Sequence, residues 1–473
     1  MNDQPVSIAD ALNLAVQSHQ AGNMDEAEYI YREILKAVPD QPDALHLLGV
    51  LTYQRGDHEN AVVLINRAIQ LRPEFPEACN NLGNALAEQG RLEQAADAYR
   101  RAITLNPDFA EAHDNLGKAL TLQGRADEAI DCYRRAVAIR PDYAQAHNNL
   151  GHALGELDRQ DEAAAAHRRA IEIDPGYAEA HYNLGIALAE QGKPDEAAAC
   201  YNRAVAIRPD YAQAHGNLAT LYRNQGKLEP AAACCRRVLE IDPANAAATH
   251  MLAALTGQTP ESAPPQYVKD LFDGFAGKFD RELTQMLDYK TPALLRREFD
   301  KLAEKNAAPR RVMDLGCGTG LSGLAFRPIA ETLHGIDLAP KMIDKAREKS
   351  IYDDLQIGNF VERLNREDAT YDLFTAADVF VYLGNLRPVF QAVEKSSCGG
   401  AYFVFSTEHA DAGDYVLRPT GRYAHSQNYI RSLAGEFGFA VETCAPAEIR
   451  KEQGKGVAGD IYILKRLPGA QTS

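Results

Sequence analysis

The sequence predicts an α-solenoid followed by a doubly wound α/β sheet of seven strands with an antiparallel last strand. Two observations support this prediction. Strand-like apolar runs alternate with helical runs in the second half of the chain, which is typical of a parallel sheet covered by helices. In the first half, prolines recur every 34 residues, at Pro39, Pro73, Pro107, Pro141, Pro175, Pro209 and Pro243. We therefore expect a repeat array over residues 1–257, a linker over 258–266 and an α/β domain over 267–473.

Charge narrows the functions that fit the chain. Its 473 residues carry a formal net charge of −16, and residues 1–266 hold 23 Lys+Arg against 37 Asp+Glu. Because binding to phosphates needs Lys and Arg, this acidic half argues against nucleic-acid binding. It suits a basic peptide or protein partner, although a merely solvated surface would show the same composition.

The predicted compartment is the cytoplasm. No apolar run approaches the roughly 20 residues that a bilayer crossing needs, and the N-terminus lacks the basic head and apolar body of a signal peptide. The eight cysteines include no C-x-x-C pair, and three of them recur at one repeat position. We therefore expect neither a disulfide framework nor a metal site, and no membrane contact.

Each 34-residue unit of the first half has the pattern of two helices. The first helix carries a Leu-Gly pair, as in Leu82-Gly83, and the second places residues such as Ala95 and Tyr99 on one apolar face. A unit can bury that face only against its neighbours, so the array should form a right-handed solenoid. We count seven units and a capping helix at 246–257. The period and these motifs resemble those of tetratricopeptide repeat proteins.

An asparagine recurs in the first helix of five units, at Asn81, Asn115, Asn149, Asn183 and Asn217. An amide offers both donors and an acceptor, so such a column can bind an extended peptide backbone whatever its sequence. The column is similar to the asparagine ladder that lines the superhelix of O-linked N-acetylglucosamine transferases. That likeness implies a groove for a protein or peptide partner. The alternative is that these asparagines serve only helix packing or local hydrogen bonds.

The second half begins with an amphipathic segment from Tyr267 to Phe279 and a helix over about 291–305. The expected strands lie near 311–314, 332–336, 354–357, 371–376, 401–406, 439–444 and 459–465. The expected helices lie near 321–330, 340–349, 359–366, 385–396 and 427–437. The last two strands have no helix between them, which predicts one antiparallel member in an otherwise parallel sheet.

The chemical centre of the chain is the stretch 311–320, which reads R-V-M-D-L-G-C-G-T-G. A short apolar run ends in Asp314, and three glycines follow at alternate positions. They are Gly316, Gly318 and Gly320. Glycines permit positive φ and let a ligand approach the backbone closely. A second acid, Asp337, ends the next apolar run, where a carboxylate can accept hydrogen bonds from ribose hydroxyls.

This arrangement resembles that of class I S-adenosylmethionine-dependent methyltransferases, which have a Rossmann-like sheet. The whole chain is similar to predicted bacterial methyltransferases that carry N-terminal tetratricopeptide repeats. The resemblance implies S-adenosylmethionine as the cofactor. The residues that we assign to cofactor binding are Asp314, Gly316, Gly318, Gly320, Asp337, Asn359 and Asp378. Many relatives place an acid at the position of Asn359 to bind the adenine amino group, and the asparagine oxygen can accept the same hydrogen bond.

The glycine spacing fits two other classes of nucleotide-binding site less well. A nicotinamide dehydrogenase would show G-x-G-x-x-G, whereas the spacing here is G-x-G-x-G. A nucleoside-triphosphate site would require G-K-[ST] after the glycines, and that sequence does not follow them.

Ligands of an open α/β sheet bind beyond the carboxyl ends of its strands. This rule selects Asp378 and Tyr382, after the fourth strand, as catalytic candidates. The polar segment 418–429 is too long to be a mere connection, and we expect it to frame the acceptor pocket, with His425 as candidate base and Arg422 as an anion contact. A base is needed only if the acceptor must lose a proton. The alternative for His425 is a surface or helix-capping role.

The favoured interpretation is an S-adenosylmethionine-dependent methyltransferase whose acidic array recruits a protein or peptide partner. One alternative is a scaffold whose second domain binds the cofactor without turnover. Another is a small-molecule O-methyltransferase whose repeats serve assembly. No [DN]-P-P-[YF] motif follows the fourth strand, which argues against N-methylation of nucleobases or glutamine amides.

Overall fold

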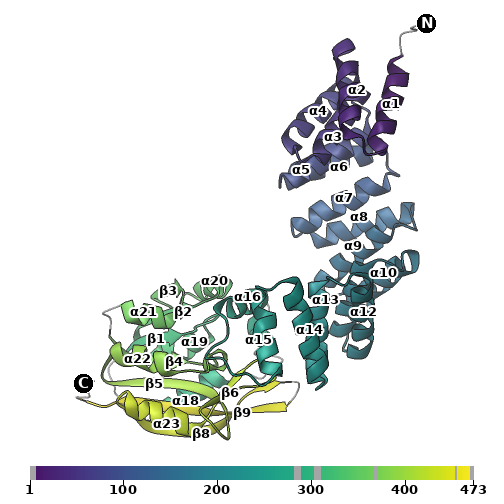
Figure 1. Ribbon diagram of the computed structural model, residues 1–473. Coiled ribbons are helices and arrows are strands. Elements are labelled where there is room, and N and C mark those ends of the chain that lie inside the picture. The colour runs from purple at the N-terminus through teal and green to yellow at the C-terminus, as the bar shows by residue number, and fades with distance from the viewer. Residues whose placement is uncertain are drawn as a thin grey trace. The chain divides into compact units, whose positions relative to one another are not determined.

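The structure, a computed structural model, describes residues 7–277, 279–281, 289–302, 310–366, 370–452 and 455–468. These residues form two compact units, one that ends at Ala214 and one that begins at His215. The first unit is helical, and the second contains the sheet (Figure 1). Within the described residues, no helix combines the length and the apolar character that crossing a membrane requires.

The α-solenoid fold predicted for the first part of the chain is confirmed. The helices are α1 Ile8–Gln20, α2 Met24–Ala37, α3 Pro42–Gln54, α4 His58–Leu71, α5 Pro76–Glu88, α6 Leu92–Leu105, α7 Ala110–Leu122, α8 Ala126–Ile139, α9 Ala144–Glu156, α10 Gln160–Ile173, α11 Ala178–Glu190, α12 Pro194–Ile207, α13 Ala212–Asn224, α14 Leu228–Ile241 and α15 Ala246–Leu255. Glycines such as Gly124, with a φ of 74°, follow the first helices and end them. In the fifth unit Asp158 adopts a φ of 62° at that position.

The Leu-Gly pairs are explained by close packing between the two helices of a unit. A Cβ added to Gly117 would lie 2.6 Å from the ring of Tyr133, so only glycine lets α7 and α8 approach to this distance. In the fifth unit His167 replaces the tyrosine and packs against Gly151 in the same way. His167 is buried, and burial lowers its pKa to about 3, so this histidine is a neutral packing residue.

The second unit contains a Rossmann-like sheet. Its strands are β1 Arg310–Leu315, β2 Ala330–Asp337, β3 Asp354–Ile357, β4 Tyr371–Ala376, β5 Ser397–His409, β6 Tyr415–Leu417, β7 Tyr423–His425, β8 Phe439–Glu452 and β9 Lys455–Arg466. The strands β3, β2, β1, β4 and β5 pair in that order and are parallel. Strand β9 then pairs antiparallel with β5, and β8 pairs antiparallel with β9. The predicted antiparallel member is therefore confirmed.

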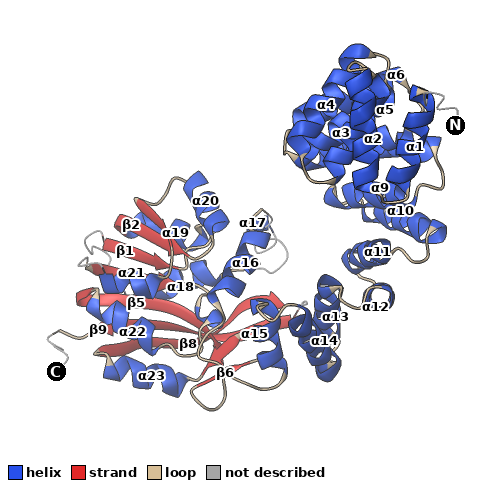
Figure 2. Ribbon diagram, turned by 45° about the horizontal axis from the view of Figure 1, so that its top comes forward, coloured by secondary structure: helices blue, strands red, loops and turns tan. Residues whose placement is uncertain are grey.

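Helices cover both faces of this sheet (Figure 2). The helices that follow α15 are α16 Pro265–Phe275, α17 Phe279–Arg281, α18 Thr291–Leu302, α19 Leu321–Phe326, α20 Pro340–Glu348, α21 Phe360–Arg366, α22 Arg387–Lys395 and α23 Gln427–Glu436. Helices α21, α22 and α23 pack on the face that contains Met313, and α18 and α19 pack on the face that contains Val312. Because successive strand residues point to opposite faces, β1 is apolar on both sides, as a central parallel strand requires.

Part of the predicted loop 418–429 is a strand. Strands β6 and β7 pair antiparallel with each other, and β7 pairs parallel with the end of β5, where Glu408 lies opposite Ala424. We call β6 and β7 the ribbon. It continues the sheet beyond the carboxyl end of β4, which stops at Ala376. The described part of the sheet thus has nine strands, two more than predicted.

Much of the segment predicted as a linker is held in the second unit. Residues 259–264, which we call the strap, run alongside the segment that follows β4. Ser262 forms a β-bridge with Leu383, and the Ala263 N–H donates to the Tyr382 carbonyl at 2.9 Å. Ala263 is buried, and its side chain packs in a cluster with those of Ala254, Leu417 and Tyr423.

Helix α15, the capping helix of the array, packs against the ribbon. His250 of α15 is buried, and its Nε2 donates to the Gly421 carbonyl between the two ribbon strands at 2.8 Å. Its ring also lies 4.8 Å from that of Tyr267 on α16. The end of the predicted array is therefore continuous with the packing of the second unit.

Candidate functional site

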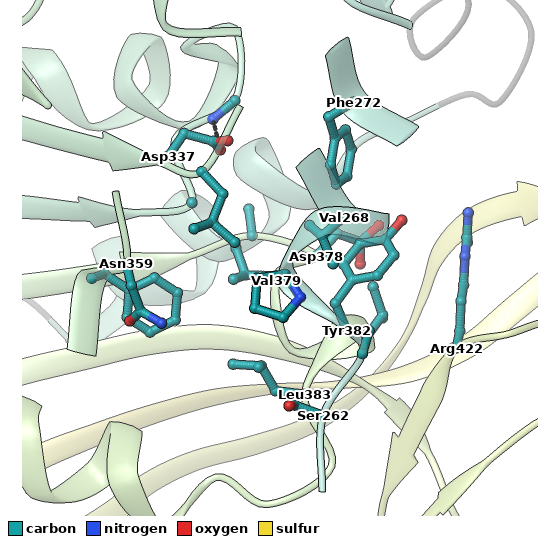
Figure 3. A pocket seen from close by; sticks show the side chains of 18 of the residues that line it. Ser262, Val268, Phe272, Asp337, Asn359, Asp378, Val379, Tyr382, Leu383 and Arg422 are labelled. Carbon is teal, nitrogen blue, oxygen red and sulfur yellow. Dashed lines mark hydrogen bonds between the residues drawn. The ribbon is translucent and has the colours of Figure 1, made fainter. Parts of the chain in front are cut away.

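One cavity of about 230 Å³ lies at the carboxyl edge of the sheet (Figure 3). It is lined by residues that end or follow four neighbouring parallel strands. They are Gly316 and Gly318 after β1, Asp337 at the end of β2, Asn359 after β3, and Asp378 and Tyr382 after β4. The strap and α16 contribute Ser262, Ala263, Val268 and Phe272. The cavity therefore brings together six of the nine residues that the sequence predicts for cofactor binding or catalysis.

The glycine loop forms one wall of this cavity. Gly316 has a φ of 65° and Gly318 has a φ of 52°, a left-handed backbone that disfavours other residues. A Cβ on Gly316 would lie 2.7 Å from Val379, whereas a Cβ on Gly318 would meet nothing closer than 3.9 Å. A side chain at Gly318 would therefore occupy space beside the cavity that the loop keeps open.

Asp337 ties the glycine loop to β2. Its Oδ2 accepts the Gly318 N–H and its Oδ1 accepts the Ala339 N–H, each at 2.9 Å. Burial raises the pKa of Asp337. A carboxylate has about four acceptor positions, and backbone N–H groups of Gly318, Ala339 and Leu338 use only part of this capacity, so the carboxylate can still accept from a ribose. The residue can hold the loop and a nucleoside at the same time.

Asp314 and Gly320 do not line the cavity. Asp314 is buried beneath the loop, where its Oδ2 accepts the Tyr352 hydroxyl at 2.6 Å, and burial raises its pKa to about 7. Gly320 has a φ of 95° and precedes α19. Their positions suit support of the loop from behind rather than contact with a ligand, which is a narrower role than the one the sequence predicts.

Asn359 lines the cavity and also caps a helix. Its Oδ1 accepts the Val361 N–H at 2.8 Å at the start of α21. Because this oxygen already caps the helix, the amide nitrogen is the better placed of the two polar atoms for a hydrogen bond to a base. This differs from the sequence expectation, in which the oxygen accepts from an adenine amino group.

Asp378 lies on the opposite side of the cavity from the β2 and β3 loops. It has a φ of 58°, in the left-handed region that Asp adopts more readily than most residues with a Cβ. Its N–H donates to Ser406 Oγ at 3.0 Å, and its Oδ2 accepts from Arg450 Nη1 at 3.1 Å. Its Oδ1 is buried and has no hydrogen-bond partner within the described residues. A buried orphan acceptor beside a cavity is a group that a ligand can satisfy.

Tyrosines and apolar side chains surround Asp378. The Tyr382 ring meets Phe272 of α16 edge to face, with ring centroids 5.3 Å apart. Burial raises the pKa of Tyr382 to about 12, so its hydroxyl stays protonated at neutral pH and can donate a hydrogen bond. The apolar lining residues are Val268, Phe272, Phe279, Val379, Val381 and Leu383. This part of the cavity can exclude water from a bound ligand.

His425 does not line the cavity. It lies on β7, fully buried, with its Nε2 3.1 Å from the Gly384 carbonyl and its ring stacked on Tyr429. Burial lowers the pKa of His425 to about 4. The ring is therefore a neutral packing group of the ribbon, and its position does not fit the predicted role of base. Arg422, from the same segment, does line the cavity.

Four asparagines of the predicted ladder form hydrogen bonds between repeats in the first unit. Asn149 Nδ2 donates to the buried Asp114 of the preceding repeat at 2.9 Å. The other three hydrogen-bonded pairs are Asn81 with His46, Asn115 with Asn80, and Asn183 with Asn148. Asn217 has the same place on α13 in the second unit. These bonds favour the packing role, while the half-buried amide oxygens leave acceptors that a peptide could use.

Sequence reasoning missed two parts of the site. Arg450 on β8 lines the cavity and is buried, and the only local signal is a charge within a strand. Ser262 and Ala263 line the cavity from the strap, which has the prolines of a linker. Among the described residues, no group of three or more His, Cys, Asp and Glu side chains is placed to hold a metal ion.

Family models match both parts of the chain. Models described as TPR repeat and Tetratricopeptide repeat match residues 51–90, 83–124, 117–158, 148–212 and 182–246. A model described as Methyltransferase domain matches residues 287–443. The chain therefore carries tetratricopeptide repeats followed by a methyltransferase domain, as the sequence predicts.

Curated relatives match the second part. The chain is 29% identical to the 18S rRNA (guanine-N(7))-methyltransferase of Bos taurus, over 28% of this chain and 46% of that protein. It is 28% identical to the Ubiquinone biosynthesis O-methyltransferase of Bordetella avium, over 26% of this chain and 56% of that protein. The chain thus spans about half the length of these curated relatives.

Solved structures match the repeats. One is the crystal structure of YrrB, described as a TPR protein with an unusual peptide-binding site. It is 25% identical with a TM-score of 0.35, and the match covers 39% of this chain and 96% of that one.

Proposed function

Because the chain joins tetratricopeptide repeats to a methyltransferase domain, we propose that it transfers a methyl group from S-adenosylmethionine to an acceptor bound beside Asp378. The array, in this proposal, binds a protein or peptide that carries or delivers the acceptor. The observation that supports it best is the single cavity in which the glycine loop and Asp337 lie opposite Asp378 and Tyr382. Methyltransferase relatives support S-adenosylmethionine-dependent methylation in general.

The residues on the β1 to β3 side fit the cofactor. Asp337 has free acceptor positions for ribose hydroxyls, the backbone at Gly318 leaves room for close approach, and the Asn359 amide can bond a base. Bound S-adenosylmethionine would supply a methyl group on a sulfonium sulfur. The sulfur is a good leaving group, because it departs as a neutral thioether when the methyl group is transferred. The protein would then have to align the acceptor with that methyl group and exclude water. Phe272, Tyr382 and the strap cover the acceptor side and suit this task.

The polar groups on the acceptor side favour an acceptor that carries a proton on its nucleophilic atom. The unpartnered Oδ1 of Asp378 would accept a hydrogen bond from a hydroxyl or an amine and take up its proton as the methyl group is transferred. Tyr382, protonated at neutral pH, would donate to the acceptor. A carboxylate acceptor, which has no proton to give, would face Asp378 as a like charge.

Labelling with tritiated S-adenosylmethionine tests the proposal. The purified full chain is incubated with a cell lysate, which is then separated into protein and small-molecule fractions, and calorimetry measures cofactor binding in parallel. We expect tight binding and label in the protein fraction. If label appears only in the small-molecule fraction, the acceptor is a small molecule and the array serves assembly. If the chain binds S-adenosylmethionine but transfers no label to either fraction, it is a scaffold without turnover. Failure to bind S-adenosylmethionine would overturn the proposal.

A further inference from the structure

Beneath the acceptor side of the cavity lies a chain of alternating charges that we call the ion network. Arg450 Nη1 donates to Asp378 Oδ2 at 3.1 Å, and Arg450 Nη2 donates to Glu408 Oε1. The other oxygen of Glu408 lies 3.6 Å from Arg418 Nη1. These residues come from β8, from the end of β5 and from the segments that follow β4 and β6. The network therefore joins the acceptor wall to the outer strands of the sheet.

The network is too deeply buried to be explained as a surface ion pair. The side chains of Arg450 and Glu408 are each 3% exposed and that of Asp378 is 16% exposed. Removing charges from water is costly, and apolar side chains of similar volume often give equal stability. A stability advantage is therefore a poor reason for this arrangement, whereas a requirement for geometry at Asp378 is a good one.

The backbone and the carboxylate of Asp378 are each held by a neighbouring side chain. The Asp378 φ of 58° lies in the left-handed region, which Asp adopts more readily than most residues with a Cβ, and two hydrogen bonds hold the residue in this conformation. Ser406 holds the backbone and Arg450 holds one carboxylate oxygen. The planar guanidinium fixes direction as well as charge, because its donors form a rigid fork. The other oxygen, Oδ1, is then left without a partner beside the cavity.

We propose that Arg450, itself held by Glu408, is a positioning residue that keeps the Asp378 carboxylate turned toward the acceptor. This inference rests on the proposed function and adds to it the residue on which orientation depends. In the reaction, the acceptor's nucleophilic atom forms a bond to the methyl carbon while the methyl–sulfur bond breaks. The proton on that atom passes to Asp378 Oδ1, and Arg450 keeps this oxygen aligned throughout.

Turnover in a double-mutant cycle tests the inference. Arg450→Met and Arg450→Lys are compared in full-length chains with and without Asp378→Asn, using tritiated S-adenosylmethionine and the lysate fraction that the unchanged chain labels. We expect Arg450→Met to lower turnover by about 100-fold, the scale of a 1 Å misplacement, and Arg450→Lys to recover part of that loss. In the Asp378→Asn background, Arg450→Met should lower turnover no further, because its effect passes through Asp378. Affinity for the cofactor should stay within about twofold, since the hydrogen bonds described for Arg450 go to Asp378 and Glu408, on the acceptor side of the cavity.

A matched control separates positioning from the loss of a buried ion pair. Arg466 on β9 pairs with Glu394, and their side chains are 11% and 15% exposed, but neither lines the cavity. Arg466→Met should leave turnover unchanged. If Arg450→Met kept full turnover, or lowered it by the same factor in both backgrounds, the inference would be overturned.

Hydrogen exchange provides a readout that needs no acceptor. In the full chain, Arg450→Met should speed amide exchange in the segment 376–384 by at least fivefold, and Arg466→Met should leave that segment unchanged. This exchange result without any labelling by the unchanged chain would reject the proposed function and still support Arg450 as the residue that holds Asp378. Unchanged exchange in the Arg450→Met chain would overturn the inference, whether or not labelling occurs.

Discussion

Asp337 carries the most direct prediction for cofactor binding at the scale of single residues. Asp337→Asn should raise the Kd for S-adenosylmethionine by about 10- to 100-fold, because a hydrogen bond to a charged group contributes about 1.5–3 kcal/mol. Titration calorimetry on the full chain measures this. Asp353→Asn is the control, since Asp353 also accepts a backbone N–H, that of Leu333 at 2.7 Å, outside the cavity. Equal affinities in the Asp337→Asn and unchanged chains would contradict the assignment.

His425 carries a prediction about stability rather than turnover. Burial lowers its pKa to about 4 from an ordinary value of 6.5, so the unfolded state binds the proton more tightly. Its contribution to stability is therefore fully present above pH 6.5 and is lost as the pH falls toward 4. Between pH 7.5 and 5 the unchanged chain should lose about 2 kcal/mol more than His425→Gln. Denaturant unfolding at both pH values measures the difference.

His425→Gln also distinguishes packing from base catalysis. If the ring acts as a base, the substitution should abolish transfer and remove one limb of the pH–rate profile. With the ring buried against Gly384 and Tyr429, we expect transfer at pH 7.5 to persist at a rate within a few-fold of the unchanged chain.

A site residue could be predicted from the sequence when the pattern that marks it lies in the residues next to it. Gly316, Gly318 and Asp337 end or follow strands at fixed offsets, so strand ends and glycine spacing were enough to predict that they share one edge of the sheet. Arg450 and His425 depend on which strands pair across the sheet. Arg450 is one of several charged residues in β8, and the sequence does not reveal that its partners are Glu408 and Asp378, more than 40 and 70 residues earlier in the chain.

At the scale of elements, helix α9 contains a matched pair of glycines. A Cβ on Gly151 would lie 2.6 Å from the ring of His167, whereas a Cβ on Gly155 would meet nothing closer than 3.9 Å. Gly151→Ala should destabilise the array by about 1–3 kcal/mol through overpacking. Gly155→Ala should stabilise it by up to about 1 kcal/mol through helix propensity. Unfolding followed by far-ultraviolet circular dichroism measures both, and equal effects of the two substitutions would contradict the packing argument.

The strap can be tested as an element of the site. Ala263 is 4% exposed, so Ala263→Asp would bury a charge and should destabilise the second unit by at least about 3 kcal/mol. It should also weaken binding of S-adenosylmethionine, because the strap lines the cavity. The neighbouring Glu261→Gln is the control, since the Glu261 side chain is exposed, and the hydrogen bonds from Gly384 and Asn385 go to its backbone carbonyl, which the substitution keeps. Calorimetry and thermal unfolding of both variants distinguish these outcomes.

Helices and strands with a periodic pattern in their own sequence could be predicted. Elements that form only by pairing with a segment far away in the sequence could not. The 34-residue repeat and the alternating runs led to helix pairs and to seven strands close to those observed. The ribbon strands are three residues each, too short to show a period, and they form because the end of β5 extends beyond β4. Likewise, the prolines of the strap indicate a linker, while its hydrogen bonds to the segment after β4 are not encoded in that local composition.

At the scale of the whole molecule, the boundary between the two compact units predicts where the chain can be shortened without loss of cofactor binding. A chain that begins at residue 215 keeps α15 and the strap and should bind S-adenosylmethionine as the full chain does. A chain that begins at residue 258 lacks the α15 contacts to Leu417, Tyr423 and Gly421. It should melt at a lower temperature and bind more weakly, because removing Ala254 and His250 exposes buried apolar surface. Equal melting temperatures for the two chains would contradict this.

The hydrogen bond from His250 to Gly421 also has a consequence for ancestry. It crosses the position at which two genes, one for repeats and one for a transferase, would be joined on the basis of sequence motifs alone. A descendant that exchanged its repeats at that position would inherit an α15 unsuited to its ribbon, and selection would remove it. Helix α15 and the transferase domain should therefore share one evolutionary history, while recombination remains free to lengthen, shorten or replace the repeats that precede α15.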